Sequence, residues 1–241
     1  MRRVALFLTL LGFFGCTTVN FSLVNPAAKD FHPRTVASLP PTVGEYEAAR
    51  DVVDVVIAKG LIEKGQFENV LDAATIKTMM ESSPELINDV STYIQRVNTL
   101  GVSDKALASR LRDSLKTDAF FLTYVTAWGY GRMEGSKVGR VGLGVKLVDP
   151  STGTIMWKAN HDMVKDYWFF KPKLNDMAGE VLAILLKEMP HFTPVAAPTP
   201  AAPPAPSAVV PEPLEKEQVK EQLPSPPAEA LKNSPEITET K

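Results

Sequence analysis

The chain has 241 residues, a formal net charge of −2 and a single cysteine, Cys16. A chain so close to neutral lacks the basic face of a nucleic-acid binder, so we expect no nucleic-acid partner. One cysteine excludes an intramolecular disulfide, so stability must come from a hydrophobic core, and apolar residues make up 44% of the sequence. The length is that of one ordinary domain with an appendage.

The N-terminal segment has the pattern of an export signal. Two arginines precede an apolar run over 4–14, which is shorter than the roughly twenty residues that a membrane-spanning helix needs. The Gly15-Cys16 junction that follows resembles the bacterial lipobox, with Phe13 where the box usually has Leu. The resemblance implies cleavage between Gly15 and Cys16, a diacylglycerol on the Cys16 thiol and a fatty acyl chain, such as palmitate, on the new amino terminus. The alternative is a soluble secreted protein that loses Cys16 with its signal peptide.

The first half of the domain is predicted to alternate strands and helices. A short apolar strand over 35–39 ends at Pro40, and apolar residues at spacings of three and four from Tyr46 to Gly60 predict a helix. A second strand over 67–71 completes a βαβ unit, so these two strands should be parallel and joined by a right-handed crossover.

Helices are expected next, over 73–100 and from about 103 to 115. Pro84 suits the first turn of a new helix within the first segment, and Ser103 is a good N-cap for the second. The strand predicted over 119–125 is an almost continuous apolar run, which is typical of a central strand covered on both faces.

The last part of the domain changes to antiparallel structure. Apolar residues alternate with Gly and Lys over 141–147, a turn follows at 149–153, and 154–159 returns as the second strand of a hairpin. A final helix is expected over 174–189, with Asn175 as its cap. The predicted fold class is α/β: a single mixed-sheet domain with a parallel βαβ first half, an antiparallel hairpin second half and helices packed on the sheet.

The chain is therefore divided into a lipoprotein signal peptide (1–15), a lipid-anchored linker (16–31), the α/β domain (32–190) and a Pro-rich tail (191–241). Twelve of the twenty prolines follow Phe192, in a stretch with few large apolar side chains to bury. Such a stretch cannot offset the entropy of ordering, so we expect the tail to be disordered. Deletion of everything after His191 should then leave the folding of the domain intact.

Three phrases of the sequence resemble bacterial lipoproteins built on a domain like the amino-terminal domain of TolB. They are HPRTVASLPP at 32–41, KTDAFF at 116–121 and VDPSTGTIMW at 148–157. That group includes the curli secretion channel subunit, lipoprotein activators of penicillin-binding proteins, and uncharacterised lipoproteins first noted as neisserial antigens. The third phrase is most similar to the uncharacterised lipoproteins. The resemblance spans 32–190 and implies the α/β fold of that domain in a Gram-negative cell envelope.

The channel-forming member of this group can be tested against the sequence. Each subunit of such a pore gives two hairpins to a transmembrane barrel, with strands of about ten residues that alternate apolar and polar side chains. The insert between Val125 and Val141 is too short and too charged for one such hairpin, and no second candidate exists. We therefore expect no pore.

The sequence shows no catalytic or metal-binding motif. It has no Gly-x-Ser-x-Gly elbow, no P-loop and no zinc-type spacing of Cys or His. His161 lies near Asp162 and Asp166, and we interpret the three as a solvated rim rather than a metal site. The glycines from 129 to 144 lie between predicted strands, so we interpret them as turns, bulges and close strand contacts. We expect no enzymatic activity, no metal and no cofactor apart from the lipid on Cys16.

One cluster is a candidate partner-binding feature. Tyr167, Trp168, Phe169 and Phe170 are consecutive, with lysines on both sides, between the predicted hairpin and the last helix. Four consecutive side chains cannot all face one core, so at least one ring should be exposed, and exposed Trp and Tyr commonly anchor partners. The sequence favours a simpler interpretation, in which the rings cover the sheet edge and any exposed ring contacts lipid headgroups or nothing.

These features predict a membrane-anchored envelope lipoprotein that acts as a non-enzymatic accessory, assembly or transport-auxiliary protein through protein-protein contacts. Thr17 follows Cys16 in place of the Asp that often signals retention in the inner membrane, so the expected location is the outer membrane, facing the periplasm or the cell surface. The expected partners are the membrane, through the lipid, and envelope proteins or the cell wall, and self-association stays open. The alternative is a lipoprotein that binds a small molecule or glycan at the end of the sheet near Trp128 and Tyr130.

Overall fold

The computed structural model describes residues 19–192 of the chain. The signal peptide, the expected lipidation site at Cys16 and the Pro-rich tail from residue 193 onward lie outside the described residues.

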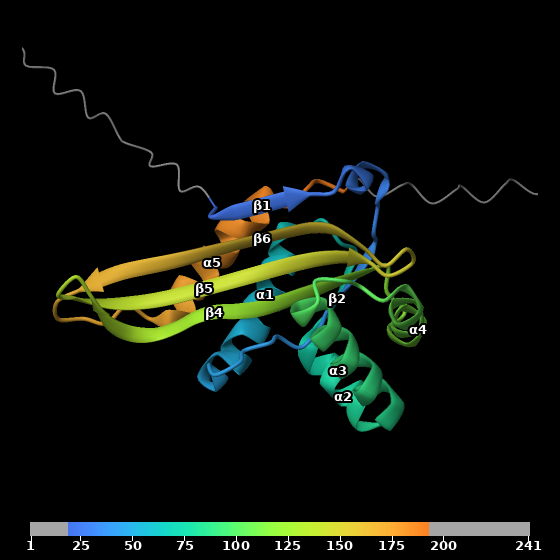
Figure 1. Ribbon diagram of the computed structural model, residues 1–241, viewed down its shortest axis with the longest axis horizontal. Coiled ribbons are helices and arrows are strands. Elements are labelled where there is room, and N and C mark those ends of the chain that lie inside the picture. Colours follow the sequence, from blue (N-terminus) through green and yellow to red (C-terminus); the bar gives the residue numbers. More distant parts are fainter. Residues whose placement is uncertain (1–18, 193–241) are drawn as a thin grey trace, which may run out of the picture. The chain divides into compact units, whose positions relative to one another are not determined.

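Six strands form one sheet in the order β1-β6-β5-β4-β2-β3 (Figure 1). β2 pairs in parallel with β3 and β4, whereas the other neighbouring strands are antiparallel. The expected mixed sheet, parallel in its first half and antiparallel in its second, is confirmed. The strands are β1 (Phe21–Val24), β2 (Thr35–Ser38), β3 (Asn69–Leu71), β4 (Ala119–Met133), β5 (Ser136–Asp149) and β6 (Thr154–Tyr167).

The helices of the described residues pack on both faces of this sheet. They are α1 (Arg50–Lys64), α2 (Ala73–Glu81), α3 (Pro84–Thr99), α4 (Lys105–Leu115) and α5 (Leu174–Glu188), with 3-10 helices at Pro26–Asp30 and Glu47–Ala49. None of the helices within 19–192 is long and apolar enough to cross a membrane.

The side chains of the sheet divide into two cores. On one face, α1 and α5 cover a large core that includes Phe121, Leu143 and Trp157. On the other face, α2, α3 and α4 cover a smaller core that includes Phe120 and Leu122 near one end of the sheet. Consecutive residues of β4 alternate between the two cores, as expected for a strand that is buried on both faces.

Two helix caps differ from the sequence-based expectation. Asp104 caps α4, because its carboxylate accepts a hydrogen bond of 3.1 Å from the Leu107 amide, whereas the Ser103 hydroxyl pairs with the Tyr93 hydroxyl at 2.8 Å. Asn175 is also not a cap. α5 starts after Lys173, whose side chain makes no capping bond. Pro84 does occupy the first turn of α3 as predicted.

The expected linker over 16–31 is wrong in its described part. β1 pairs with the outer edge of β6, and Ser22 Oγ accepts a hydrogen bond of 3.2 Å from Trp157 Nε1. The open edge of β6 explains this, because its backbone groups need partners and a short apolar segment can supply them.

The predicted end of the domain at residue 190 is also too early. Phe192 is 4% exposed and packs edge-on against Phe31, with ring centroids 5.6 Å apart. The folded domain therefore continues at least to Phe192, beyond the boundary that composition alone gave.

The insert between Val125 and Val141 is regular hairpin structure rather than a loop. β4 runs on to Met133, and Glu134 and Gly135 form the turn with positive φ angles of 50° and 86°. In Figure 1 the long β4, β5 and β6 extend together as a ribbon, with the β4–β5 turn at its end.

Candidate functional site

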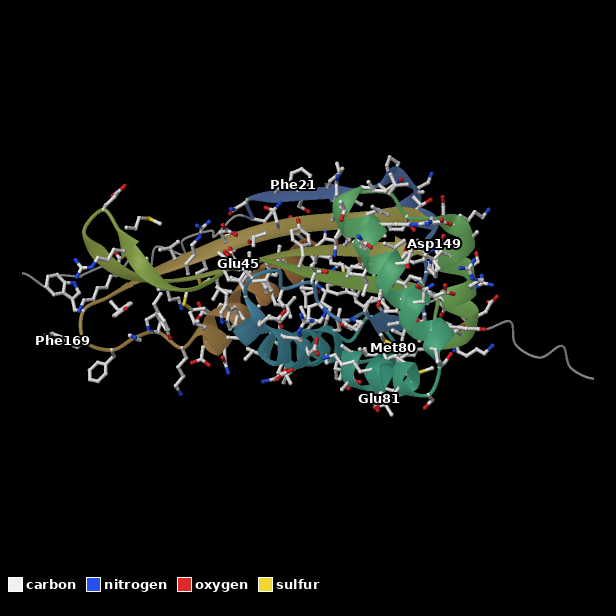
Figure 2. The ribbon with its side chains drawn as sticks, turned by 60° about the horizontal axis from the view of Figure 1, so that its bottom comes forward. Phe21, Glu45, Met80, Glu81, Asp149 and Phe169 are labelled. Carbon is white, nitrogen blue, oxygen red and sulfur yellow. The ribbon has the colours of Figure 1, made fainter. Side chains whose placement is uncertain are left out.

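The loop between β6 and α5 carries the candidate partner-binding residues. Tyr167, the last residue of β6, pairs with Lys137 at the start of β5, so the loop begins beside the β4–β5 turn. Figure 2 shows Phe169 and Asp149 at opposite ends of the ribbon. The loop therefore lies at the end of the sheet that is remote from α2, α3 and α4.

Three of the four candidate rings are almost fully exposed. The exposed fractions of Trp168, Phe169 and Phe170 are 87%, 90% and 91%. We call these three residues the aromatic tip. Single exposed apolar side chains are ordinary, whereas a contiguous exposed group of this kind is unusual and makes the tip a candidate interaction surface. The interpretation of these rings as a cover over the sheet edge does not fit, because they bury almost nothing.

Tyr167 belongs to the base of the loop rather than to its tip. Its half-buried ring meets the ring of Tyr130 edge-on, with centroids 5.9 Å apart and an interplanar angle of 83°. Tyr130 Oη also donates a hydrogen bond of 2.7 Å to the carbonyl of Pro172, and Lys171 Nζ lies 4.8 Å from the Tyr130 ring centroid. Tyr130 thus fixes both arms of the loop, one through Tyr167 and the other through Pro172.

A glycine in β5 allows the loop to return close to the sheet. A Cβ atom at Gly139 would lie 2.8 Å from Pro172 Cγ and 3.3 Å from Met177 Sδ. A side chain at position 139 would therefore push the returning arm and the start of α5 away. The base of the loop is packed and hydrogen-bonded while the aromatic tip is exposed, which is the arrangement of a preorganised binding surface.

The charges around the aromatic tip are mainly basic. Lys165 is neutralised by Glu180 on α5, with 2.6 Å between Nζ and a carboxylate oxygen. The other nearby charged residues in the chain are the basic Arg132, Lys137, Lys171 and Lys173 and the acidic Glu134 and Asp166. A partner with an acidic rim around an apolar pocket would complement this surface.

The alternative binding region near Trp128 and Tyr130 does not form a free pocket wall. Trp128 is partly buried and packs against the large core. Tyr130 is engaged with Tyr167 and Pro172 as described above. Both rings therefore already have structural partners.

The interpretation of His161 as part of a solvated rim is wrong. His161 is 6% exposed, and its Nδ1 lies 2.9 Å from Asn20 Oδ1 at the β1–β6 edge. Asp162 lies on the opposite face of β6, where it accepts hydrogen bonds from Thr126 Oγ1 at 2.8 Å and Arg140 Nη2 at 2.6 Å. Alternation along the strand therefore separates the two side chains. Within residues 19–192, no group of three or more His, Cys, Asp or Glu side chains could hold a metal ion.

The glycines of the ribbon behave as close contacts and turns. The Tyr124 ring lies over Gly144, where a Cβ atom would come within 2.0 Å of Tyr124 Cζ. Gly142 similarly leaves room for Asp162 and Thr126, and Gly135 occupies the β4–β5 turn. These positions serve packing and chain reversal.

Comparison with known proteins gives similarities in fold. No family model and no curated protein sequence matches the chain. Among solved structures, it is similar to the PelC dodecamer from Paraburkholderia phytofirmans, at 17% identity and a TM-score of 0.44, over 70% of this chain and 94% of that one. Lipoprotein GNA1162 from Neisseria meningitidis is 15% identical with a TM-score of 0.45, over 65% of this chain and 97% of that one. Protein XCC0632 from Xanthomonas campestris is 9% identical with a TM-score of 0.37, over 68% of this chain and 85% of that one.

Proposed function

We propose that this chain is a membrane-anchored envelope lipoprotein with a non-enzymatic accessory role, and that its aromatic tip docks onto another envelope protein. The observation that carries the proposal is the exposure of 87–91% of Trp168, Phe169 and Phe170 on a loop whose base is fixed. Exposed apolar rings are costly in water, and large aromatic side chains are the commonest anchors of protein interfaces. The basic residues around the tip add a preference for an acidic partner surface.

The lipid on Cys16 would hold the protein at the outer membrane, facing the periplasm. Changing Cys16 to Ser should release the protein into the soluble periplasmic fraction or leave an uncleaved precursor. A Cys16→Ser variant that is processed and still partitions with membranes would contradict the anchor. The docking role of the tip is a separate claim and needs its own test.

The docking claim can be tested by photo-crosslinking in intact cells of the source bacterium. One variant of the full chain would carry p-benzoylphenylalanine in place of Phe169 and a second in place of Phe170. A control variant would carry it in place of Leu100, which is 69% exposed outside the tip. We expect one envelope protein to be crosslinked from position 169 and from position 170, and not from position 100. The same protein, once purified, should bind the Trp168→Ala variant about 30-fold more weakly, which corresponds to about 2 kcal/mol.

Two results would overturn the docking claim. Crosslinks from positions 169 and 170 that reach only lipid would assign the tip to the membrane surface. A small molecule or glycan that raises the melting temperature equally in the native chain and in the Trp168→Ala variant, with no protein partner crosslinked from the tip, would favour the ligand-binding alternative.

A further inference from the structure

Two large apolar side chains of α1 are exposed on the side of the helix that faces away from the core. Val53, Ile57 and Leu61 fill the large core, yet Val55 and Ile62 are 68% and 63% exposed on other sides of the helix. A helix on the surface of a domain normally presents polar side chains outward. Most of the other exposed residues of α1 are charged, so Val55 and Ile62 are the exceptions that a packing partner would cover.

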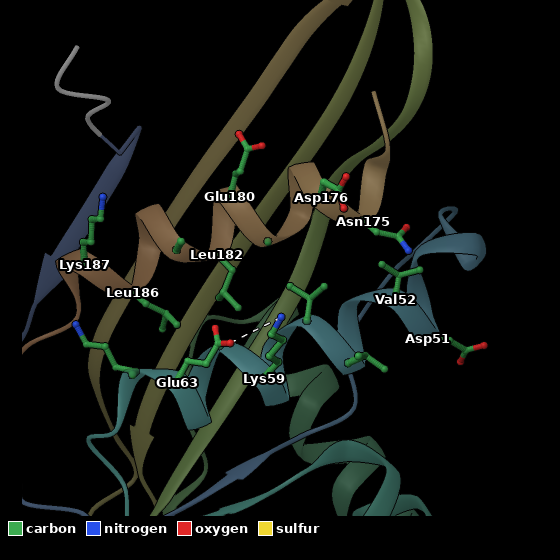
Figure 3. Close-up of a pocket in the computed structure, with 16 residues that line it drawn as sticks. Asp51, Val52, Lys59, Glu63, Asn175, Asp176, Glu180, Leu182, Leu186 and Lys187 are labelled. Carbon is green, nitrogen blue, oxygen red and sulfur yellow. Dashed lines mark ion pairs between the residues drawn. The ribbon is translucent and has the colours of Figure 1, made fainter. Parts of the chain in front are cut away.

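A groove of about 980 Å³ runs between α1 and α5 next to this face. The two helices lie side by side and point in the same direction, with Leu182 and Leu186 of α5 turned toward α1 (Figure 3). Gly60 allows the two helices to lie close together, because a Cβ atom at this position would lie 2.5 Å from Leu182 Cδ2. Gly179 instead leaves open space, because nothing lies within 4 Å of its Cβ position. The groove thus has an apolar floor and room for side chains from outside.

Acidic residues lie at one end of this groove and basic residues lie at the other. Asp51 and Asp176 lie at the N-terminal ends of α1 and α5, and Lys64 and Lys187 lie at their C-terminal ends. Figure 3 shows Asp51 and Asp176 at the opposite end from Lys187. The three other charged lining residues are paired within the chain, Lys59 with Glu63 at 3.7 Å and Glu180 with Lys165 at 2.6 Å. The groove therefore has one acidic end and one basic end.

We propose that the α1–α5 groove is the interface between two copies of this chain, related by a two-fold axis across the groove. A two-fold axis that lies in the interface, perpendicular to the length of the groove, places the groove against its own copy in the reverse direction. The acidic end of one groove then meets the basic end of the other, and Val55 and Ile62 are covered by the facing copy. A uniformly charged partner, or an anionic lipid surface, would be repelled at one of the two ends, so this charge pattern favours a second copy over either. This proposal does not depend on the aromatic tip, which lies on a different segment.

Charge reversal provides a direct test with the mature, lipidated full chain in detergent. Asp51→Lys with Asp176→Lys makes both ends of the groove basic, and Lys64→Glu with Lys187→Glu makes both ends acidic. We expect sedimentation velocity at low salt to show a dimer of the native chain. Self-association of each double variant should weaken about tenfold or more, because like charges then face each other. An equimolar mixture of the two variants should form a mixed dimer close to the native affinity.

A second pair of variants tests the apolar contact without altering the charge pattern at the ends. Val55→Asp should abolish the dimer, whereas Val102→Asp, at a residue 63% exposed outside the groove, should leave it intact. Equal melting temperatures of the two variants would show that the loss is not due to unfolding. A native chain that stays monomeric, a dimer that survives Val55→Asp, or a mixture of charge variants that does not associate would each overturn the proposal.

Discussion

Two groups of aromatic residues in this protein have opposite environments. At the end of the sheet covered by helices, Phe120, Phe121 and Trp157 are each 0% exposed. At the far end of the ribbon, the three rings of the aromatic tip are almost fully exposed. Residue type is the same in both places, so hydrophobicity alone does not decide burial. What differs is the number of elements available to cover the chain, because helices pack on both faces of the sheet near residue 120 and the loop after β6 has none over its rings.

The comparison indicates that the two ends have different roles. The buried aromatics stabilise the fold, since each removes a large apolar surface from water. The exposed aromatics contribute little to folding and are available to a partner. The following substitutions test this division, starting with the largest expected effect on stability.

Trp157→Ala should lower the free energy of unfolding by about 3 to 5 kcal/mol, because it leaves a cavity in the large core. It also removes the hydrogen bond from Trp157 Nε1 to Ser22 Oγ, which helps to hold β1 against β6. Chemical denaturation of the folded chain would measure the loss. A cost below about 1 kcal/mol would contradict the packing described for this end of the sheet.

Phe192→Ala should cost somewhat less, about 2 to 4 kcal/mol, because Phe192 lies at the margin of the same core against Phe31. A chain truncated after Phe192 should melt like the full chain, whereas one truncated after His191 should melt at a lower temperature. Equal melting temperatures for the two truncations would show that the contact between Phe31 and Phe192 contributes nothing.

A smaller effect is expected at the helix that begins after Asp72. The Asp72 carboxylate accepts a hydrogen bond of 2.7 Å from the Thr75 amide, and hydrogen bonds to Thr75 lower the pKa of Asp72 below its ordinary value. A lowered pKa in the folded state means that this contribution is present above the ordinary pKa of about 4 and is lost as the pH falls through the folded-state value. Asp72→Ala should cost about 1 kcal/mol at pH 7, and Asp72→Asn should cost less because Asn is also a good N-cap.

Denaturation of these two variants at pH 7 and at pH 2 to 3 would check the cap. The stability difference between Asp72→Asn and the native chain should shrink or reverse in acid, since the native carboxylate becomes protonated while the amide does not change. A difference that is independent of pH would mean that the ionised carboxylate does not matter at this position.

Much of the fold could be predicted from periodicity. The strand over 35–38, the position of Pro84 and the last helix follow directly from local patterns, and so does the division into a parallel and an antiparallel half. The wrong predictions, the linker at 16–31 and the domain end at residue 190, depend on contacts between segments far apart in the sequence. β1 and Phe192 could not be predicted because a short apolar segment is recognised as ordered only when its partner, the edge of β6 or the ring of Phe31, is known.

Prediction of the candidate partner-binding site from the sequence has the same limit. The sequence identifies four consecutive aromatics, but not which of them is held by Tyr130 and which are exposed. The long strands β4 and β5 carry the loop to the far end of the sheet, and Gly139 leaves room for its returning arm. Neither effect follows from the local sequence pattern. The sequence does not distinguish the exposed Val55 and Ile62 of α1 from its buried apolar residues. The separation of charge along the groove depends on α5 lying beside α1, which is a contact between segments far apart in the sequence.

The most direct test of the division between the two ends is to measure stability and partner binding together in one variant of the tip. Trp168→Ala should leave the free energy of unfolding within about 0.5 kcal/mol of the native value, since the side chain is 87% exposed, and should weaken partner binding about 30-fold. Trp157→Ala serves as the matched control, because it removes the same ring from the buried end. If Trp168→Ala destabilised the fold by 3 kcal/mol or more, or left partner binding unchanged, the central claim that the aromatic tip serves docking rather than packing would be contradicted.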